Sequence, residues 1–419
     1  MSFASPASYA VGVAQSDIPA AWMPSSEPRV ASGGSQRIVA ISSQNGTVTA
    51  GQQLSFQLPS NLGSGFAKSG SFYVRMRVTP TQAVARNWAF RQYGAAESLF
   101  LRMTALLSGS IAEQIQNYNK LCASLKLHCT NASYVANDDS LLQLTMNGNL
   151  NTVDSVDVCV PVNLGLFNAK AHLPLFLLSA CQLQIDLESA AQAFTSGSAN
   201  PITDYSISQA QLVFEQLVPD SVYEAGVKQM LASRVYQIGI NTWYNVKLSN
   251  AAVITQNIGL NSSSVKAVLW NVVTANTSQT SGAFTSDSQT SAYLYLDGQL
   301  VSNSNLSTQA EQFAEMNRAL NVLTDINRTS WAPSAITSPA VGGDFTIGPC
   351  DRTKYSNGAY LGGLSCSRSD QAGFSFSGTA VNTAVLQRSG GATVGDFYIY
   401  VALQQVVTID LAGNVNLIR

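Results

Sequence analysis

The sequence contains two histidines and six cysteines, which are the side chains best suited to metal binding or nucleophilic chemistry. Cys122, His128 and Cys129 lie near one another, but their spacing fits no common zinc pattern. His128 falls in an apolar segment that we expect to be a strand, where a packed histidine is more common than a ligand. His172 precedes Leu173 and Pro174, away from the other candidate ligands. We therefore expect no metal site.

Motifs for covalent or phosphate chemistry are incomplete. The run GLSCS at 363–367 resembles a nucleophile elbow but lacks its final glycine. The run NLGSG at 61–65 has no lysine or helix start beside it, so we expect a turn and not a phosphate-binding loop. Carboxylates pair at few places, Asp138 with Asp139 and Asp154 with Asp157. These pairs are typical of turns, and the sequence predicts no catalytic residue, no cofactor-binding residue and no enzyme.

Charge is scarce along the whole chain. Charged residues make up 11% of the 419 residues and hydrophobic residues 46%, while the net charge is −2. An average soluble domain is about 25% charged, so we expect much of the surface to be covered by other protein. No cluster of basic residues is present, which argues against direct sequence-specific binding of nucleic acid. The sequence also shows no secretory signal and no apolar run long enough for a transmembrane helix.

The elements that would position any site are short strands. Apolar residues alternate with polar ones in SFYVRMRV at 71–78, in QLQIDL at 182–187 and in FYIYV at 397–401. Clusters of Gly, Asn, Ser and Pro separate these runs. Many half-buried strands with turn residues between them predict an all-β protein built of antiparallel sandwiches.

Helical patterns occur at two places nearly half a chain apart. After a strand at 99–107 and a turn at Ser108 and Gly109, the capping box of Ser110 and Glu113 predicts a helix over 110–125. The same order returns with a strand at 291–296, a turn at 297–298 and a second box. That box consists of Thr308 and Glu311. The repetition predicts a duplicated domain.

The remaining segments complete the expected organisation. Residues 1–35 are rich in Ser, Ala, Pro and Gly and are expected to form a flexible N-terminal arm. A third box, Ser221 with Glu224, predicts a linking helix within 219–233. Three polar stretches are expected to be long outward loops, namely 188–204, 274–290 and 327–343. N-x-S/T sequons begin at Asn45, Asn131, Asn261, Asn276, Asn305 and Asn327.

Several stretches resemble the double jelly-roll major capsid proteins of tailless icosahedral double-stranded DNA viruses, in particular the polinton-like virus and virophage branch. The resemblance covers about 37–419, and four stretches carry it: SLFLRMTALLSGSIAEQIQNYNKL (98–121), HLPLFLLSACQLQIDLE (172–188), QLVFEQLVPDSVYEAGV (211–227) and DFYIYVALQQVVTIDLAGNVNLIR (396–419). This chain is short for that branch, so any surface towers should be small.

The resemblance implies two tandem jelly-roll β-sandwiches at 36–218 and 234–419, with a short helix in each. It implies a structural protein of the virion that forms homotrimeric, pseudo-hexagonal capsomers and an icosahedral shell. The implied partners are further copies of the chain, neighbouring capsomers, penton and minor capsid proteins, and an internal membrane beneath the shell. No cofactor is implied.

Three alternatives stay open at the level of the sequence. A tandem β-sandwich lectin or adhesin would use the polar loops to bind glycans. A glycan-cleaving enzyme would need two facing carboxylates about 5–10 Å apart, and the sequence offers no convincing pair. A minor capsid or vertex protein is the third, although a two-lobed trimer does not fit a fivefold position.

Overall fold

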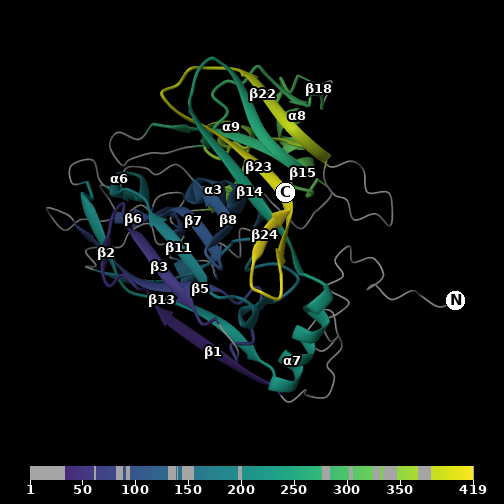
Figure 1. The fold of residues 1–419 in the computed structure, drawn as a ribbon. Coiled ribbons are helices and arrows are strands. Elements are labelled where there is room, and N and C mark those ends of the chain that lie inside the picture. Colours follow the sequence, from purple (N-terminus) through teal and green to yellow (C-terminus); the bar gives the residue numbers. More distant parts are fainter. Residues whose placement is uncertain are drawn as a thin grey trace.

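A computed structural model describes residues 34–60, 63–81, 88–90, 95–130, 138, 140–143, 155–196, 201–275, 284–301, 305–323, 331–333, 347–366 and 379–418. It shows an antiparallel β protein in which two sets of strands stack on each other (Figure 1). The predicted arm, 1–35, lies outside the described residues except for 34 and 35, where the first strand begins.

The first set of strands comes from the N-terminal half of the chain. It contains β1 (Ser35–Ser42), β2 (Val48–Thr49), β3 (Gln53–Leu58), β4 (Phe66–Ala67), β5 (Tyr73–Thr81), β6 (Trp88–Phe90), β7 (Phe100–Leu107), β8 (Ser110–Gln116), β9 (Val156–Pro161), β10 (Leu173–Pro174), β11 (Cys181–Leu187), β12 (Phe194–Ser196) and β13 (Asp204–Val218). Its helices are α3 (Tyr118–Cys129), α5 (Ser140–Gln143) and α6 (Ala190–Ala193), with 3-10 turns at Ala96–Leu99 and Leu175–Leu177.

The second set follows the helix α7 (Ser221–Met230) and a 3-10 turn at Leu231–Ser233. It contains β14 (Tyr236–Ser249), β15 (Val253–Thr274), β16 (Phe284–Thr285), β17 (Ser291–Leu296), β18 (Gln299–Leu300), β19 (Trp331–Pro333), β20 (Ile347–Pro349), β21 (Gly362–Ser365), β22 (Thr379–Ser389), β23 (Gly395–Ile409) and β24 (Val415–Ile418). Its helices are α8 (Gln309–Ala319) and α9 (Arg352–Asn357).

The two sets share one pairing order. In the first set one layer runs β3-β11-β7-β8, and the other contains β1-β13-β5-β9. In the second set, β15 pairs with β22 through its first part and with β23 through its second part, with register shifts between Gly259 and Ala267. The layers are therefore β15-β22-β17-β18 and β14-β23-β15-β21. Each set has two facing layers of four strands in jelly-roll order.

The prediction of a helix beginning at Ser110 is wrong, because this segment is the strand β8. Ser108 and Gly109 both have positive φ, 48° and 82°, as a type I′ hairpin turn requires. The chain therefore turns back as a strand along β7 and becomes helical at Tyr118. His128, which was expected on a strand, lies in that helix.

The corresponding turn in the second set has the same geometry. Asp297 and Gly298 have φ of 47° and 79°, and the chain returns as β18. The predicted cap at Thr308 is confirmed, since its hydroxyl accepts a hydrogen bond from the Glu311 N–H at 3.3 Å and α8 follows. The repeated unit is therefore a strand, a hairpin turn, a strand and a helix.

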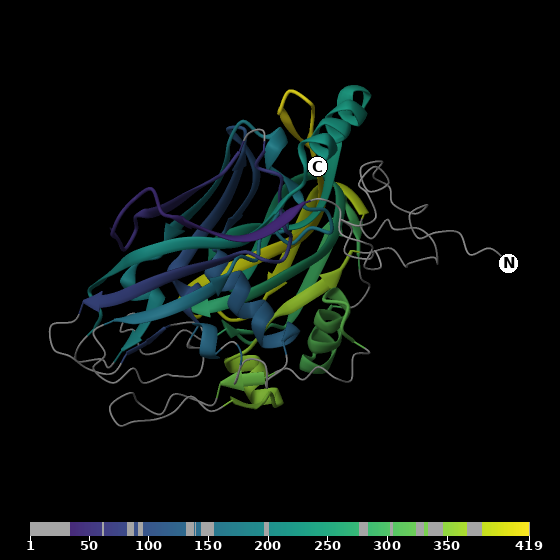
Figure 2. The same cartoon turned by 90° about the horizontal axis from the view of Figure 1, so that it is seen from below.

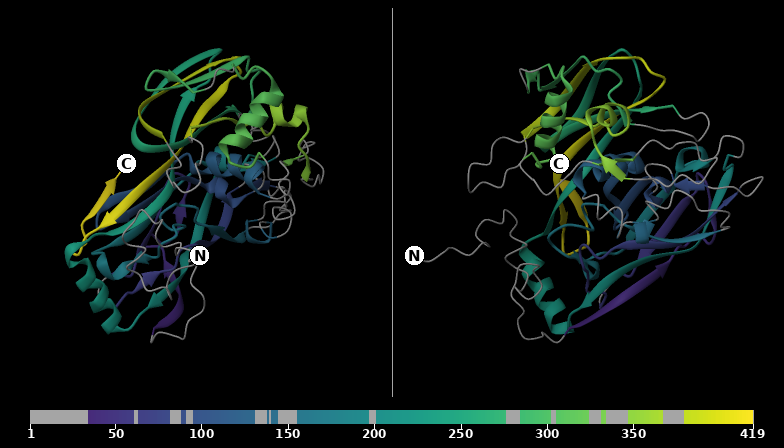
Figure 3. Two further views of the ribbon diagram at one scale, coloured as in Figure 1. Left: turned by 90° about the vertical axis from the view of Figure 1, so that its right-hand side faces the viewer. Right: turned by 180° about the vertical axis from the view of Figure 1, so that it is seen from behind.

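The linking helix is confirmed, but its cap is one residue earlier than predicted. Asp220 is the N-cap, and its carboxylate accepts a hydrogen bond from the Tyr223 N–H at 2.7 Å. Helix α7 protrudes at one end of the molecule, away from α8 and α9 (Figures 2 and 3).

The three predicted loops are only partly described. The segment 188–204 contains α6 and β12, so it is not purely a loop, and 197–200 lie outside the described residues. Of 274–290 the structure describes β16 and the residues beside it, and of 327–343 it describes β19.

Candidate functional site

His128 is hydrogen-bonded inside the fold. Its Nε2 atom lies 2.7 Å from the carbonyl oxygen of Ala359, and its ring meets Tyr355 edge-on. Burial lowers the pKa of His128 to about 4, so the ring is neutral near pH 7 and donates from Nε2 to that carbonyl. Among the described residues, no group of three His, Cys, Asp or Glu side chains could hold a metal ion.

His172 also has structural partners. Its Nδ1 atom accepts a hydrogen bond from the Ser69 N–H at 3.3 Å, and its carbonyl oxygen accepts one from the Tyr236 hydroxyl at 2.9 Å. The latter bond connects the two sets of strands. His172 thus helps to hold the sets together.

The candidate motifs of the sequence are structural as well. Ser365 ends β21, which pairs with β15, and is not on a nucleophile elbow. Asp157 forms a two-pronged ion pair with Arg77 at 2.8 and 2.9 Å. Of the other paired carboxylates, Asp139 and Asp154 lie outside the described residues, and Asp138 is exposed.

The glycine-rich run at 61–65 is described from Gly63 on, and this part binds a carboxylate of the chain itself, while 61 and 62 lie outside the described residues. The Gly63 and Gly65 N–H groups donate to Glu224 of α7 at 3.1 and 3.2 Å. Gly65 has a φ of +61°, and a Cβ built there would lie 2.0 Å from the carbonyl oxygen of Leu217. Glycine is required at this position, and the turn fixes α7 to the first set.

One group of polar contacts lies where the two sets meet. We call this region the junction; it comprises α3 and β8 on one side and the facing sheet of β14, β23 and β15 on the other. Asn271 donates to the Ser124 hydroxyl at 2.8 Å and accepts from the Tyr400 hydroxyl at 3.3 Å. Asn245 donates to the carbonyl oxygen of Gln116. Buried amides with partners on both sides fix how the sets pack.

Glu113 is a buried carboxylate at the junction. It accepts hydrogen bonds from the Gly165 and Leu166 N–H groups at 2.9 and 2.7 Å. Burial raises the pKa of Glu113, and hydrogen bonds from Leu166, Thr242 and Gly165 oppose that rise. A Cβ on Gly165 would lie 2.0 Å from the carbonyl oxygen of Asn241, so the sets approach closely here.

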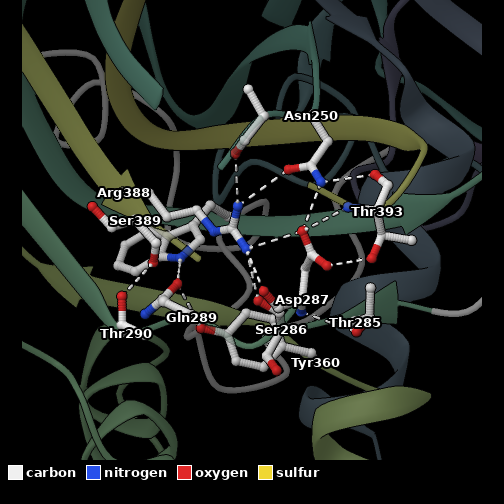
Figure 4. A network of polar contacts seen from close by, with 12 residues as sticks. Asn250, Thr285, Ser286, Asp287, Gln289, Thr290, Tyr360, Arg388, Ser389 and Thr393 are labelled. Carbon is white, nitrogen blue, oxygen red and sulfur yellow. Dashed lines mark hydrogen bonds and ion pairs between the residues drawn. The ribbon is translucent and has the colours of Figure 1, made fainter. Parts of the chain in front are cut away.

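A second buried network lies inside the second set and was missed by the sequence analysis (Figure 4). Arg388 is 1% exposed; it donates to the carbonyl oxygens of Ser286 and Asp287 at 2.9 and 3.1 Å and to Asn250 at 3.1 Å. Asn250 and Thr393 donate to the Asp287 carboxylate, which lies 3.5 Å from the guanidinium. The network connects three loops.

The Asp287 carboxylate is charged at neutral pH. Burial acts to raise its pKa, but hydrogen bonds from Thr393 and Asn250 and the charge of Arg388 outweigh that effect and lower the pKa. Nearby, Gln289 accepts hydrogen bonds from the Trp270 indole and the Tyr360 hydroxyl at 2.9 and 3.0 Å. These polar groups satisfy one another, and their arrangement holds the loops in place.

What these sites can do is structural. The networks at the junction and around Arg388 make rigid contacts between loops and between the two sets. In the part of the chain that the structure describes, no helix is long and apolar enough to cross a membrane.

Neither a protein-family model nor a curated protein matches the chain. The shared pairing order of its two sets defines a double jelly roll, and solved structures of viral capsid proteins have the same fold. VP54 of PBCV-1, as fitted into the virophage Sputnik, has a TM-score of 0.61 at 16% identity, covering 94% of this chain and 99% of that one. The Sputnik virophage structure has a TM-score of 0.60 at 12% identity, covering 93% and 89%.

The mavirus major capsid protein has a TM-score of 0.51 at 10% identity, covering 100% of this chain and 95% of that chain. The chain therefore has the double jelly-roll fold of these capsid structures over nearly its whole length. The fold class predicted from the sequence is confirmed.

Proposed function

We propose that this protein is the major capsid protein of an icosahedral double-stranded DNA virus and acts as a structural component of the virion. The observation that carries the proposal is the length of the match: both jelly rolls and the link between them correspond to capsid structures from end to end. A shared binding domain would cover only part of such chains. The proposal assigns the protein no catalysis and no cofactor.

In this proposal three chains form a pseudo-hexagonal capsomer. Two similar jelly rolls per chain give a trimer six similar units, and six units can tile a facet. We also propose that the chain divides into the jelly rolls 36–218 and 234–419 with the link 219–233 between them. Further partners would be neighbouring capsomers, penton and minor capsid proteins, and an internal membrane beneath the shell.

The chemistry of the surface supports self-assembly. Only 11% of the residues are charged, whereas free monomers usually depend on charge for solubility. Obligate interfaces bury about 2,000 Å² or more, and a sparsely charged surface loses little solvation when it is covered.

Light scattering of the full-length protein at several concentrations tests the proposal. A mass of three chains that does not change on dilution is the expected result, and electron microscopy of concentrated protein should then show hexagonal arrays. A monomer at every concentration would contradict the proposal.

A further inference from the structure

Both histidines of the chain lie at contacts between the two sets of strands. His128 belongs to α3 of the first set, and its Nε2 atom lies 2.7 Å from the carbonyl oxygen of Ala359 in the second set. His172 also belongs to the first set, and its carbonyl oxygen accepts a hydrogen bond from the hydroxyl of Tyr236 in β14 at 2.9 Å. Histidine is the side chain that ordinarily changes charge between pH 5 and 8, so every histidine of this chain acts on a contact between the sets.

Protonation of His128 would place a charge in a closed site. The side chain is 2% exposed, and burial lowers its pKa to about 4. Tyr355 of α9 meets the ring edge-on, and burial raises the pKa of Tyr355, so this neighbour stays neutral in acid. On the same helix as the histidine, Lys126 is paired with Glu97 at 2.9 Å. A protonated ring is therefore better solvated in water than in the closed contact.

His172 loses a hydrogen bond when it takes up a proton. Its Nδ1 atom accepts from the Ser69 N–H at 3.3 Å, and a protonated imidazole has no acceptor. Partial burial and the charge of Lys68 both lower the pKa of His172. A protonated ring turns away from the Ser69 N–H, and the carbonyl oxygen that holds Tyr236 belongs to the same residue.

The other titratable groups around the second histidine do not reverse this effect. Lys68 pairs with Glu215 of β13 at 2.6 Å, so these two charges balance each other. Tyr236 of β14 and Tyr223 of α7 stay uncharged in acid, because burial raises the pKa of both hydroxyls. Lys170 precedes the histidine by two residues and adds a positive charge. Together these groups disfavour a further positive charge while the contact is closed.

We propose that mild acid releases the two jelly rolls from each other before either of them unfolds, with His128 and His172 as the groups that take up the protons. Near pH 7 both rings are neutral and the contacts are closed. As the pH falls, the open form binds protons that the closed form does not bind, and the equilibrium moves toward the open form. The link at 219–233 keeps the released jelly rolls in one chain. The inference concerns a single chain and does not rest on the proposed function.

The size of the effect follows from His128. Its pKa is 6.5 in the open form and about 4 in the closed form, so the equilibrium constant for opening should rise about 20-fold when the pH falls from 7 to 5. His172 adds to this rise. Glu113 acts in the opposite direction, because burial raises its pKa and the closed form therefore takes up a proton more readily than the open form. Comparing histidine variants at one pH removes this contribution, since Glu113 is the same in all of them.

The thiol of Cys122 reports on opening. It lies on α3, it is 9% exposed, and it interacts electrostatically with Tyr400 of the second set. Cys181 and Cys366 are buried as well, but they belong to β11 of the first set and to the end of β21 in the second. Labelling of a buried thiol requires opening, so its rate follows the opening equilibrium when closing is faster than labelling. The three thiols distinguish release of the jelly rolls from unfolding of either one.

The test labels the full-length protein with a dipyridyl disulfide, which reacts with thiols in mild acid, and measures each cysteine by peptide mass spectrometry at pH 7 and pH 5. The variants are His128→Gln, His172→Asn and the two combined. Glutamine can still donate to the Ala359 carbonyl oxygen, asparagine can still accept from the Ser69 N–H, and neither titrates. At pH 7 all proteins should label at similar rates, which shows that the variants keep the fold.

At pH 5, Cys122 should label at least about 20-fold faster in the wild type than in the double variant, and each single variant should lie between them. Cys181 and Cys366 should label at the same rate in all four proteins. Equal rates for Cys122 in the wild type and the double variant would overturn the inference. Equal acceleration of Cys122 and Cys181 would overturn it too, because the first jelly roll would then be unfolding. A monomer in light scattering would contradict the proposed function and leave this inference unaffected.

Discussion

At the scale of single residues, stability depends on buried charges that have several partners each. Arg388 contacts Asp287, Asn250 and the carbonyl oxygen of Ser286. Replacing it by methionine keeps much of its volume but leaves the Asp287 carboxylate buried without a cation. Loss of one partner of a buried pair costs about 3–5 kcal/mol, and we expect Arg388→Met to lower the free energy of unfolding by that amount in urea titrations.

An exposed arginine provides the comparison. Arg318 pairs with Glu315 on α8 at 3.1 Å, and its side chain is 64% exposed. Surface pairs contribute about 0.2–1 kcal/mol, so Arg318→Met should change the free energy of unfolding by less than about 1 kcal/mol. Similar losses for the two variants would show that the Arg388 network is not a stabilising feature.

His128 makes stability depend on pH. Its pKa falls from 6.5 to about 4 on burial, because the charged form loses its solvation. Between these values the unfolded chain binds a proton that the folded chain does not, so stability decreases as the pH falls from 6.5 to about 4. The shift corresponds to about 3 kcal/mol.

The variant His128→Gln isolates this effect, since glutamine does not titrate but can still donate to the carbonyl oxygen of Ala359. Urea unfolding at pH 7, 6, 5 and 4 should show a smaller loss of stability for the variant than for the wild type, by up to about 3 kcal/mol. Parallel curves for the two proteins would rule out a buried neutral histidine.

At the scale of elements, the segment from Ser110 is a strand in the structure, whereas the sequence predicted a helix. The two conformations imply different effects of mutations in this segment. If Ser110 capped a helix, Ser110→Ala would cost about 1 kcal/mol. In the structure Ser110 is an exposed residue that begins a strand, so we expect a change below about 0.5 kcal/mol. Glu113→Ala should cost more, about 1–3 kcal/mol, because the Gly165 and Leu166 N–H groups would lose their acceptor. Thermal unfolding of both variants decides between the two structures.

The same elements show what the sequence could predict. Alternating apolar residues predicted β5 and β11, and Thr308 predicted the start of α8, because these signals depend on neighbouring residues. The helix at Ser110 was wrong because apolar residues spaced at 111, 115 and 118 satisfied a helical period by chance. The turn at 108–109 was recognised, but the return as a strand is decided by pairing with β7.

The polar networks of the structure could not be predicted from the sequence, because no familiar motif marks their residues. Asp287 and Arg388 are far apart in the sequence, and neither stands in a pattern that marks a partner. The junction likewise depends on Asn271 meeting Ser124, a contact between the two halves of the chain. Contacts of this range arise only once both jelly rolls have formed, so no local signal in the sequence could reveal them.

At the scale of the whole molecule, the junction should make the two jelly rolls unfold together. α3 packs on β7 of the first set and contacts the second set through Ser124 and His128, so unfolding of either set removes part of its packing. We therefore expect a single calorimetric transition whose calorimetric and van't Hoff enthalpies agree. The measurement is repeated at two protein concentrations, because a transition that includes dissociation of copies shifts with concentration.

Weakening the junction should separate the transitions. Asn271→Ala removes the donor to Ser124 and the acceptor for Tyr400 while it leaves the strand pairing of β15 intact. Its cost of about 1–3 kcal/mol falls on the contact between the sets, so the transition should broaden or split into two. Asn250, an amide within the second set, is the control: Asn250→Ala should lower the melting temperature and keep one transition. Two transitions already in the wild-type protein would mean that the junction contacts of Asn271 do not couple the unfolding of the two jelly rolls.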